Sequence, residues 1–174
     1  HWGMSGPAVL KLSAWGARVL AEKEYMFKVQ INWLSIKSES EANEMLDAQL
    51  EVIRRKKMIN GNPFGMPSRM WGFVLDKAGI DGDTVWHQLS KKNRNKLLNL
   101  LLNDVYEVRG KTTFKEEFVT CGGVNLSDIN MLTMESLKCK GMYFAGEVID
   151  VDGITGGFNF QAAWTTGFVA GKLN

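Results

Sequence analysis

Cysteine, histidine and proline are scarce in this sequence, which contains 2, 2 and 3 of them among its 174 residues. The cysteines, Cys121 and Cys139, fit neither a CxxC pair nor a disulfide framework. The histidines, His1 and His87, are too few to supply the ligands of a typical zinc site. We therefore expect no metal centre, and we expect a reducing, cytoplasmic environment.

Long apolar runs and a strong charge of one sign are lacking too. No run approaches the ~20 apolar residues that cross a bilayer, and no signal peptide opens the chain. The formal net charge is only +2, so we expect neither a membrane nor a nucleic acid as partner. The densest basic run, Arg54 to Lys57, ends a helical pattern, where the helix dipole favours cations. A solvated helix end is the preferred interpretation of that run.

What the sequence does contain is a helical pattern between residues 38 and 103. Ser38 and Glu41 have the spacing of a capping box, and a second helix is expected from about Pro67 to a stop at Gly79. A third helix is expected from Ser90. Apolar side chains repeat at helical spacing in all three segments: Ala42, Met45, Leu46, Leu50, Ile53, Trp71, Val74, Leu75, Ala78, Leu97, Leu98, Leu101 and Leu102. The pattern predicts a helical bundle.

A small β-layer is predicted on either side of this bundle in sequence. From Phe27 to Trp33 apolar and polar residues alternate, as in a half-buried strand. Tyr106 to Val108 is the expected partner strand. Ahead of both, residues 5–22 are expected to form a helix, with Ser5 as its cap and Pro7 in its first turn.

The character of the chain changes near residue 114. We expect a strand at residues 118–120 and a short strand, apolar on both faces, from Gly141 to Ala145. Seven glycines lie between Gly141 and Asn174, so the backbone there must turn tightly or lie against another group. The predicted fold class is therefore α+β: residues 1–114 form a β-layer with a helical bundle, and residues 115–174 form a glycine-rich α/β segment.

The glycine-rich segment is the best candidate for a binding site. Gly156 and Gly157 precede a helix, whose first N–H groups and positive dipole end suit an anion or an electron-rich carbonyl. Glu147, at the end of the expected strand, is placed to accept hydrogen bonds from sugar-like hydroxyls. A flavin would use both features. Spacing alone leaves an equal alternative, in which the glycines only make turns and Glu147 is solvated.

Three motifs bear on this choice, because each resembles a segment of the BaiN-like (YhiN-like) NAD(P)/FAD-dependent flavoproteins. The family's closing signature is similar to GMYFAGEVIDVDGITGGFNFQAAWTTGFVAG. Its TxGGV segment and TMES turn resemble VTCGGVNLSDINMLTMES, and its HxGxSGPA segment resembles residues 1–8. The sequence departs from the family at Leu137, where many relatives carry lysine. These motifs cover the start of the chain and its last sixty or so residues.

The resemblance implies an FAD-dependent oxidoreductase that passes hydride between NAD(P)H and a small organic substrate through the flavin. It implies an insert-domain remainder in residues 1–114 and the end of an FAD-binding domain in residues 115–174. It implies FAD contacts from one group of residues: Gly146, Glu147, Thr155, Gly156, Gly157, Phe158 and Asn159. It assigns no catalytic residue.

The family's GxGxxG turn, which holds the FAD pyrophosphate, does not occur in these 174 residues. The chain also opens on His1 rather than Met, and both observations suggest a piece of a longer protein. We therefore expect this chain by itself to bind FAD weakly or not at all. The alternative hypothesis is an isolated insert domain that binds a substrate or a partner and has no activity of its own.

Other candidates have weaker support. Cys121 is a possible redox thiol, but a small residue in a turn is the preferred interpretation. Asp150 and Asp152 are two acids on one loop, which is a thin case for a metal. His87 is expected to be structural.

Overall fold

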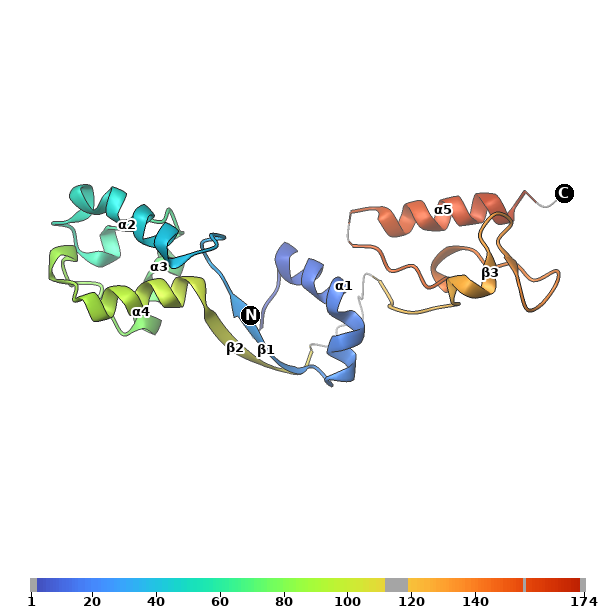
Figure 1. Cartoon of the computed structure of the whole chain (residues 1–174), viewed down its shortest axis with the longest axis horizontal. Coiled ribbons are helices and arrows are strands. Elements are labelled where there is room, and N and C mark those ends of the chain that lie inside the picture. The colour runs from blue at the N-terminus through green and yellow to red at the C-terminus, as the bar shows by residue number, and fades with distance from the viewer. Residues whose placement is uncertain (1–2, 112–118, 155, 173–174) are drawn as a thin grey trace. The chain divides into compact units, whose positions relative to one another are not determined.

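The computed structural model describes residues 3–111, 119–154 and 156–172 (Figure 1). It is an α+β structure, and contacts along the chain divide it into two compact units. The first unit comprises the residues up to Phe27 together with those from Arg109 onward, and the second, here called the helical unit, comprises Lys28–Val108. No helix among the described residues is long and apolar enough to cross a membrane.

The helices of the helical unit begin where the sequence predicts, and α3 also ends at its predicted residue. Helix α2 (Glu39–Ile53) starts at Ser38, whose Oγ accepts the Glu41 N–H at 3.2 Å. Helix α3 (Ser68–Ala78) stops at Gly79, which has the left-handed φ of 65°. Helix α4 (Lys91–Leu102) starts at Ser90, whose Oγ accepts the Asn93 N–H at 3.2 Å. The capping box is only half formed, because the Glu41 carboxylate accepts from Lys37 N–H.

These helices enclose a single apolar core. Trp71 is fully buried, its Nε1 donates to the Met58 carbonyl at 2.6 Å, and its ring stacks on Trp86 with centroids 6.3 Å apart. Met58 and Trp86 are buried because each opens a short 3₁₀ turn, Met58–Asn60 and Trp86–Gln88, that places its side chain in the core. The other buried members come from the predicted stripes and their flanks: Ala42, Leu46, Ile53, Val74, Leu75, Ala78, Ile80, Leu97, Leu98, Leu101 and Leu102. The predicted bundle is confirmed.

Strands β1 (Met26–Ile31) and β2 (Asp104–Arg109) form a two-stranded sheet, as the sequence predicts. Alternate residues of β1 are half-buried and exposed, in the predicted phase. Trp33 lies beyond the end of the strand, where its backbone N–H donates to the Leu101 carbonyl at 2.8 Å. Its ring N–H donates to Asp104, a buried carboxylate that the sequence did not single out.

Helix α1 (Pro7–Glu22) is preceded by Gly6 as its N-cap, one residue after the predicted cap, Ser5. The N-cap is Gly6, with φ 103°, and no side chain caps the helix, so the assignment of Ser5 as cap is wrong. Glycine suits this position because it adopts positive φ without a steric penalty. Pro7 occupies the first turn, as predicted.

The glycine-rich segment contains less sheet than predicted. Strands β3 (Ile129–Asn130) and β4 (Glu135–Ser136) form a short antiparallel pair, and helix α5 (Phe158–Ala170) closes the chain. Residues 141–145 are not a buried strand: within them only Tyr143 makes a bridge, to Glu135, and Met142 is 47% exposed. A strand buried on both faces needs neighbours on each side, and the described residues supply only this one bridge.

The predicted strand at residues 118–120 is wrong where the structure describes it, and the predicted domain boundary is not tested. Val119 and Thr120 are not in a strand, and Phe118 lies outside the described residues. The predicted domain boundary near residue 114 also lies outside them. The division into an insert domain (1–114) and an FAD-binding segment (115–174) therefore stays a prediction.

Candidate functional site

Helix α5 begins directly behind the two glycines that the sequence indicated. Gly156 has φ 128°, and Gly157, the N-cap, has φ 91°; side chains rarely tolerate either value. A Cβ built on Gly157 meets no described atom within 4 Å beyond its chain neighbours, so the backbone is bare there. The first N–H groups of a helix lack intrahelical partners and carry the positive dipole end. This surface is therefore suited to an electron-rich oxygen.

The loop before these glycines is fixed to the helix by Asn159. Its Oδ1 accepts the Gly153 N–H at 2.7 Å, and its Nδ2 donates to the Gly153 carbonyl at 2.9 Å. A Cβ on Gly153 would lie 3.0 Å from the Phe158 Cβ, so the loop packs closely on the first turn. The Asn159 side chain thus positions the backbone, and only its main-chain N–H is left to face a ligand.

Gly146 and Glu147 lie in a 3₁₀ turn, Gly146–Val148, rather than after a strand. The Gly146 N–H donates to Thr166 Oγ1 at 2.9 Å, and this hydroxyl donates in turn to the Ala162 carbonyl at 2.7 Å. The turn is thereby held against the middle of α5, while the Glu147 side chain is exposed. Thr166 is eight residues from Phe158, about 12 Å along the helix axis at 1.5 Å per residue. A ligand that contacts both places must be elongated.

The Gly146–Val148 turn also packs against a second glycine pair, Gly122 and Gly123. Val124 N–H donates to the Val148 carbonyl at 2.8 Å, and Asp150 N–H donates to the Val124 carbonyl at 3.0 Å. Gly123, with φ 152°, lies so close that a Cβ would be 2.6 Å from the Val148 oxygen. The TCGGV motif therefore has a packing role: it allows residues 123–124 to lie directly against residues 148–150.

The acidic loop that follows is held by partners within the same unit. Arg18 Nη2 donates to both carboxylate oxygens of Asp150, at 2.6 and 2.8 Å. A hydrogen bond with Asp152 raises the pKa of the Cys121 thiol, and partial burial acts in the same direction. A raised pKa means less thiolate, so Cys121 is not an activated nucleophile. Among the described residues, no group of three or more histidine, cysteine or acidic side chains is arranged to hold a metal.

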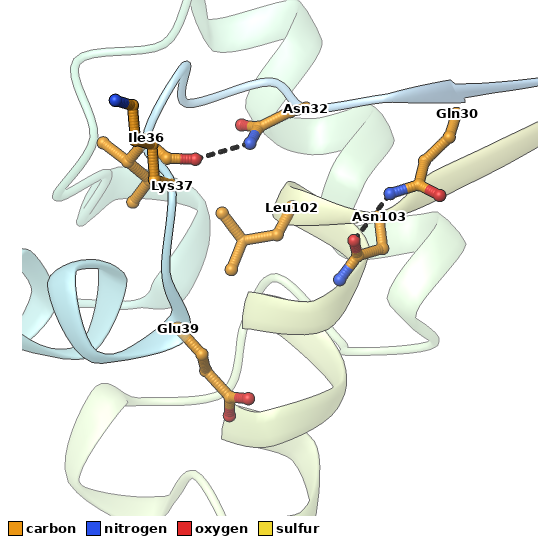
Figure 2. A pocket seen from close by; sticks show the side chains of 7 residues that line it. All are labelled: Gln30, Asn32, Ile36, Lys37, Glu39, Leu102 and Asn103. Carbon is orange, nitrogen blue, oxygen red and sulfur yellow. Dashed lines mark hydrogen bonds between the residues drawn. The ribbon is translucent and has the colours of Figure 1, made fainter.

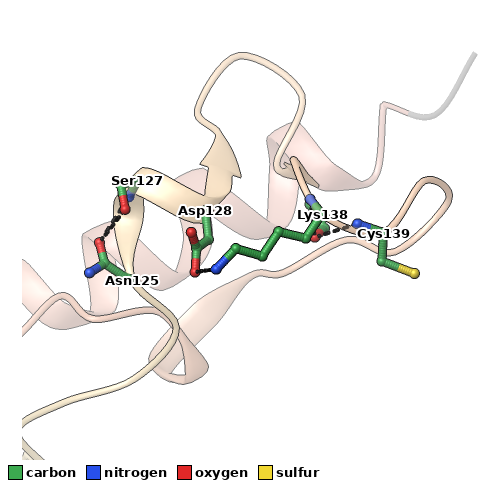
Figure 3. A network of polar contacts seen from close by, with 6 residues as sticks. Asn125, Ser127, Asp128, Lys138 and Cys139 are labelled. Atoms are coloured by element: carbon green, nitrogen blue, oxygen red, sulfur yellow. Dashed lines mark hydrogen bonds and ion pairs between the residues drawn. The ribbon is translucent and has the colours of Figure 1, made fainter.

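The turn that contains the TMES motif is fastened by polar contacts (Figure 3). Lys138 Nζ donates to Asp128 Oδ2 at 2.7 Å, and the Leu137 N–H donates to the Asp128 carbonyl at 2.8 Å. Asn125 Oδ1 accepts from the Ser127 hydroxyl at 3.0 Å at the start of the same stretch. The lysine that follows Leu137 thus has a structural partner, and Leu137 itself is 65% exposed.

Two hollows lie within the helical unit. One, of about 480 Å³, is lined largely by amides and charged groups; Figure 2 shows two hydrogen bonds among its lining residues, from Gln30 to Asn103 and from Asn32 to the Ile36 carbonyl. The other, of about 300 Å³, is lined by Arg54, His87 and Arg94 among other residues. Neither hollow was predicted, because each joins residues that are far apart in sequence.

The predicted site residues therefore fall into two groups, one at the start of α5 and one in a turn that packs against its middle. Gly156, Gly157, Phe158 and Asn159 form the start of α5, whereas Gly146 and Glu147 lie along its middle; Thr155 is outside the described residues. Sequence reasoning missed three residues that position these groups: Gly123, Gly153 and Thr166. The double glycine was a usable signal for Gly123, and no local signal marked the other two.

Comparison with known proteins adds relatives of assigned activity. Ribosomal RNA dihydrouridine synthases from Escherichia coli (strain K12) and Haemophilus influenzae are 29% identical over 174 residues and 31% identical over 170 residues. These matches cover 99% and 97% of this chain, but 40% and 39% of the relatives. A 3-dehydro-bile acid delta(4,6)-reductase from Clostridium scindens is 26% identical over 174 residues, covering 98% of this chain and 42% of that protein. The chain spans about two fifths of the length of these relatives.

The family described as HI0933-like protein Rossmann domain matches residues 15–173, which is nearly the whole chain. This match and the bile acid reductase relative confirm the resemblance to BaiN-like flavoproteins that the closing motifs indicated. On this evidence, the chain belongs to the HI0933-like family.

Proposed function

We propose that the protein carrying this chain is a flavin-dependent reductase that passes hydride from NAD(P)H, through FAD, to a carbon–carbon double bond of an organic substrate. The observation that carries the proposal is the start of α5. There, two glycines in backbone conformations that side chains rarely adopt leave the helix start uncovered by any side chain of their own. Family membership supports the same assignment.

The residues present fit the pyrimidine side of a flavin. Negative charge collects at the N1–C2=O edge when a flavin is reduced, and the N-terminal N–H groups of α5 would stabilise that charge. The exposed Glu147 carboxylate would accept hydrogen bonds from the ribityl hydroxyls. The separation of the two groups along α5 suits an elongated ligand with a ring at one end and a polyol chain behind it. When bound, FAD supplies the hydride chemistry, and this chain supplies orientation and electrostatics.

The relatives support the class of substrate bond. Dihydrouridine carries two more hydrogens than uridine across a ring double bond, and a delta(4,6)-reductase acts on double bonds of a bile acid. In both substrates such a double bond is conjugated with a carbonyl or lies in a conjugated system. We therefore propose that this protein, like these relatives, reduces a conjugated double bond. Regions outside the flavin site would determine which substrate it binds.

A pair of glycine substitutions in the complete protein tests the flavin site. Gly157→Val adds a branched side chain where the ring edge is proposed to lie, and we expect it to abolish FAD binding. Gly141→Val is the matched control, because Gly141 also has positive φ (83°) and also has no described atom within 4 Å of a built Cβ. The control carries the same kind of backbone strain, so it should retain FAD.

The measurement is FAD affinity by flavin fluorescence, with circular dichroism to confirm folding. Glu147→Ala should be milder, because it removes hydrogen bonds to a charged acceptor worth about 1.5–3 kcal/mol, or roughly tenfold to a hundredfold in affinity. If the Gly157 variant binds FAD as tightly as the unmodified protein, the helix start is not at the flavin and the double glycine serves only as a turn.

A further inference from the structure

Helix α5 differs from the other α-helices of the chain because it contains no charged residue. Its sequence, FNFQAAWTTGFVA, is uncharged on every side, whereas each of helices α1 to α4 carries charged residues. A helix that is apolar all round is typical of a protein interior. Among the described residues, however, only one face of α5 is packed, through Thr166, Val169 and Ala170.

The opposite face of α5 carries an exposed aromatic stripe, defined here as Phe160, Trp164 and Phe168. The three side chains are 69%, 70% and 65% exposed, and they follow one another at intervals of four residues along one side of the helix. The centroids of the Phe160 and Trp164 rings are 6.2 Å apart, and Lys172 Nζ lies 4.5 Å from the centroid of the Phe168 ring. A contiguous exposed apolar surface of this kind marks a place where another group packs.

Beside the aromatic stripe, the helix backbone is bare at Gly167. A Cβ built on this residue meets no described atom within 4 Å, although glycine inside a helix is less stable than alanine. No contact among the described residues therefore requires a glycine here. Gly171 lies one turn further along, and small residues one turn apart let the backbone of a second helix come close. The combination suits a neighbouring helix that packs against the rings and comes closest at Gly167.

A membrane is a poor occupant for this face. The 13 residues of α5 extend about 20 Å, which is short of the ~30 Å hydrocarbon core of a bilayer. A helix that lies on a membrane surface needs a charged face directed to water, and α5 has none.

A separate protein, including a second copy of this chain, also fits less well. A buried aromatic side chain covers about 150–250 Å², so the stripe offers at most roughly 450–750 Å². A stable interface between separate proteins takes about 800 Å² from each partner. A segment of the same polypeptide needs less area, because its docking does not cost the translational and rotational freedom of a second molecule.

The family match indicates which part of the polypeptide would cover α5. A Rossmann domain is a mostly parallel sheet with helices on both faces, so a helix of such a domain has other helices beside it. The described residues contain two sheets of two strands each, and their one parallel pairing is an isolated bridge between Val124 and Ile149. The chain spans about two fifths of the length of its relatives, so a protein of that length has ample sequence to supply the sheet and its helices.

We infer that the aromatic stripe and Gly167 dock a helix from the parallel-sheet part of the same protein, outside these 174 residues. The docked helix packs its apolar side chains against the three rings, and its backbone comes closest at Gly167. This assigns α5 to the interior of the complete protein. The inference goes beyond the proposed function, because it concerns a face of α5 that no step of the flavin chemistry uses.

The test is made in the complete protein, with matched substitutions at two glycines inside helices. Gly167→Ala adds a methyl group at the proposed contact. Gly72→Ala adds one in α3, where the new Cβ would lie 3.5 Å from Ile59 Cδ1, an ordinary van der Waals contact. Alanine stabilises a helix relative to glycine, so we expect Gly72→Ala to raise the melting temperature. We expect Gly167→Ala to lower it, because the methyl group enters space that the docked helix occupies.

The same Gly167→Ala change in the 174-residue chain should raise the melting temperature, because α5 has no docked helix there. Melting is followed by circular dichroism without FAD, so the result is independent of the flavin proposal. Light scattering gives the mass of the complete protein before and after each substitution. If Gly167→Ala raises the melting temperature of the complete protein or leaves it unchanged, the face is uncovered and the inference is overturned. A fall that accompanies the dissociation of a dimer would overturn it as well, because the occupant would then be a second copy.

Discussion

Two lysine–aspartate pairs in the helical unit have nearly the same length and very different burial. Lys77 Nζ lies 2.6 Å from Asp104 Oδ1, and the Asp104 side chain is 1% exposed. Lys57 Nζ lies 2.8 Å from Asp83 Oδ1, and both of those side chains are more than half exposed. Replacing each aspartate by alanine therefore measures the effect of burial on one kind of contact.

The expected losses differ several-fold. Asp104→Ala leaves the Trp33 Nε1–H, 3.0 Å from Asp104 Oδ2, without its acceptor, which costs about 1–3 kcal/mol. It also strands Lys77, although that side chain is 31% exposed and can reach water, so the loss should fall below the 3–5 kcal/mol of a fully buried pair. We expect a total of about 2–4 kcal/mol in the free energy of unfolding. For Asp83→Ala we expect about 0–1 kcal/mol.

The pH dependence gives an independent check. Burial alone would raise the pKa of Asp104, but hydrogen bonds with Lys77, Tyr106 and Trp33 outweigh it and lower the pKa below its ordinary value. A carboxyl with a lowered folded pKa contributes stability above its unfolded pKa of about 3.9, and loses it as the pH falls through the folded value. The stability difference between the unmodified chain and Asp104→Asn should therefore shrink below about pH 4.

The free energy of unfolding of each variant is measured by urea unfolding followed by tryptophan fluorescence, since Trp71 and Trp86 lie in the core of this unit. The variants can be compared if the urea dependence of the free energy of unfolding is unchanged and only the transition midpoint shifts. If the Asp83 and Asp104 variants lose equal stability, or if the Asp104→Asn difference persists undiminished into acid, the carboxylate is not the buried charged partner described above.

Two further substitutions test the glycine-rich segment and the first turn of helix α4. Gly123→Ala forces a Cβ to within 2.6 Å of the Val148 oxygen and should cost about 1–3 kcal/mol in thermal unfolding. Gly122→Ala, at φ 110° with open space around it, is the control for backbone strain alone, and an equal loss would exclude the contact as the cause. Lys92→Glu should raise stability by about 0.6–2 kcal/mol, because it removes a cation that the positive end of the α4 dipole disfavours by about 0.3–1 kcal/mol and places there an acid that it favours by a similar amount. A fall in melting temperature would contradict the dipole argument.

The helical unit could be predicted from the sequence because its signals are local. Ser38, Gly79 and Ser90 each set a helix end through atoms no more than four residues away. The apolar stripes then define one core without reference to distant segments. Asp104 escaped prediction because its partners, Trp33 and Lys77, lie 71 and 27 residues away.

The glycine-rich segment was predicted less well because its structure, like the contacts of Asp104, depends on residues that are distant in sequence. A run such as 141–145 is apolar on both faces, and α5 exposes Phe160, Trp164 and Phe168 at successive helical turns. Apolar composition predicts burial but does not say what supplies it. Within the described residues only one face of α5 is packed, through contacts such as that of Thr166 with the Gly146 turn. The predicted strand failed where pairing depends on neighbours that a local pattern does not specify.

The division of labour in the candidate site follows from which polar groups are already engaged. Asn159 is occupied with Gly153, Thr166 with Gly146, and Asp150 with Arg18. These side chains fix the backbone and have little capacity left for a ligand. Recognition must then come from the main chain at residues 156–158 and from the exposed Glu147. A site built in this way tolerates changes of side chain that preserve the internal hydrogen bonds, but not a change that covers the backbone, so its sensitivity to substitution is concentrated at the glycines.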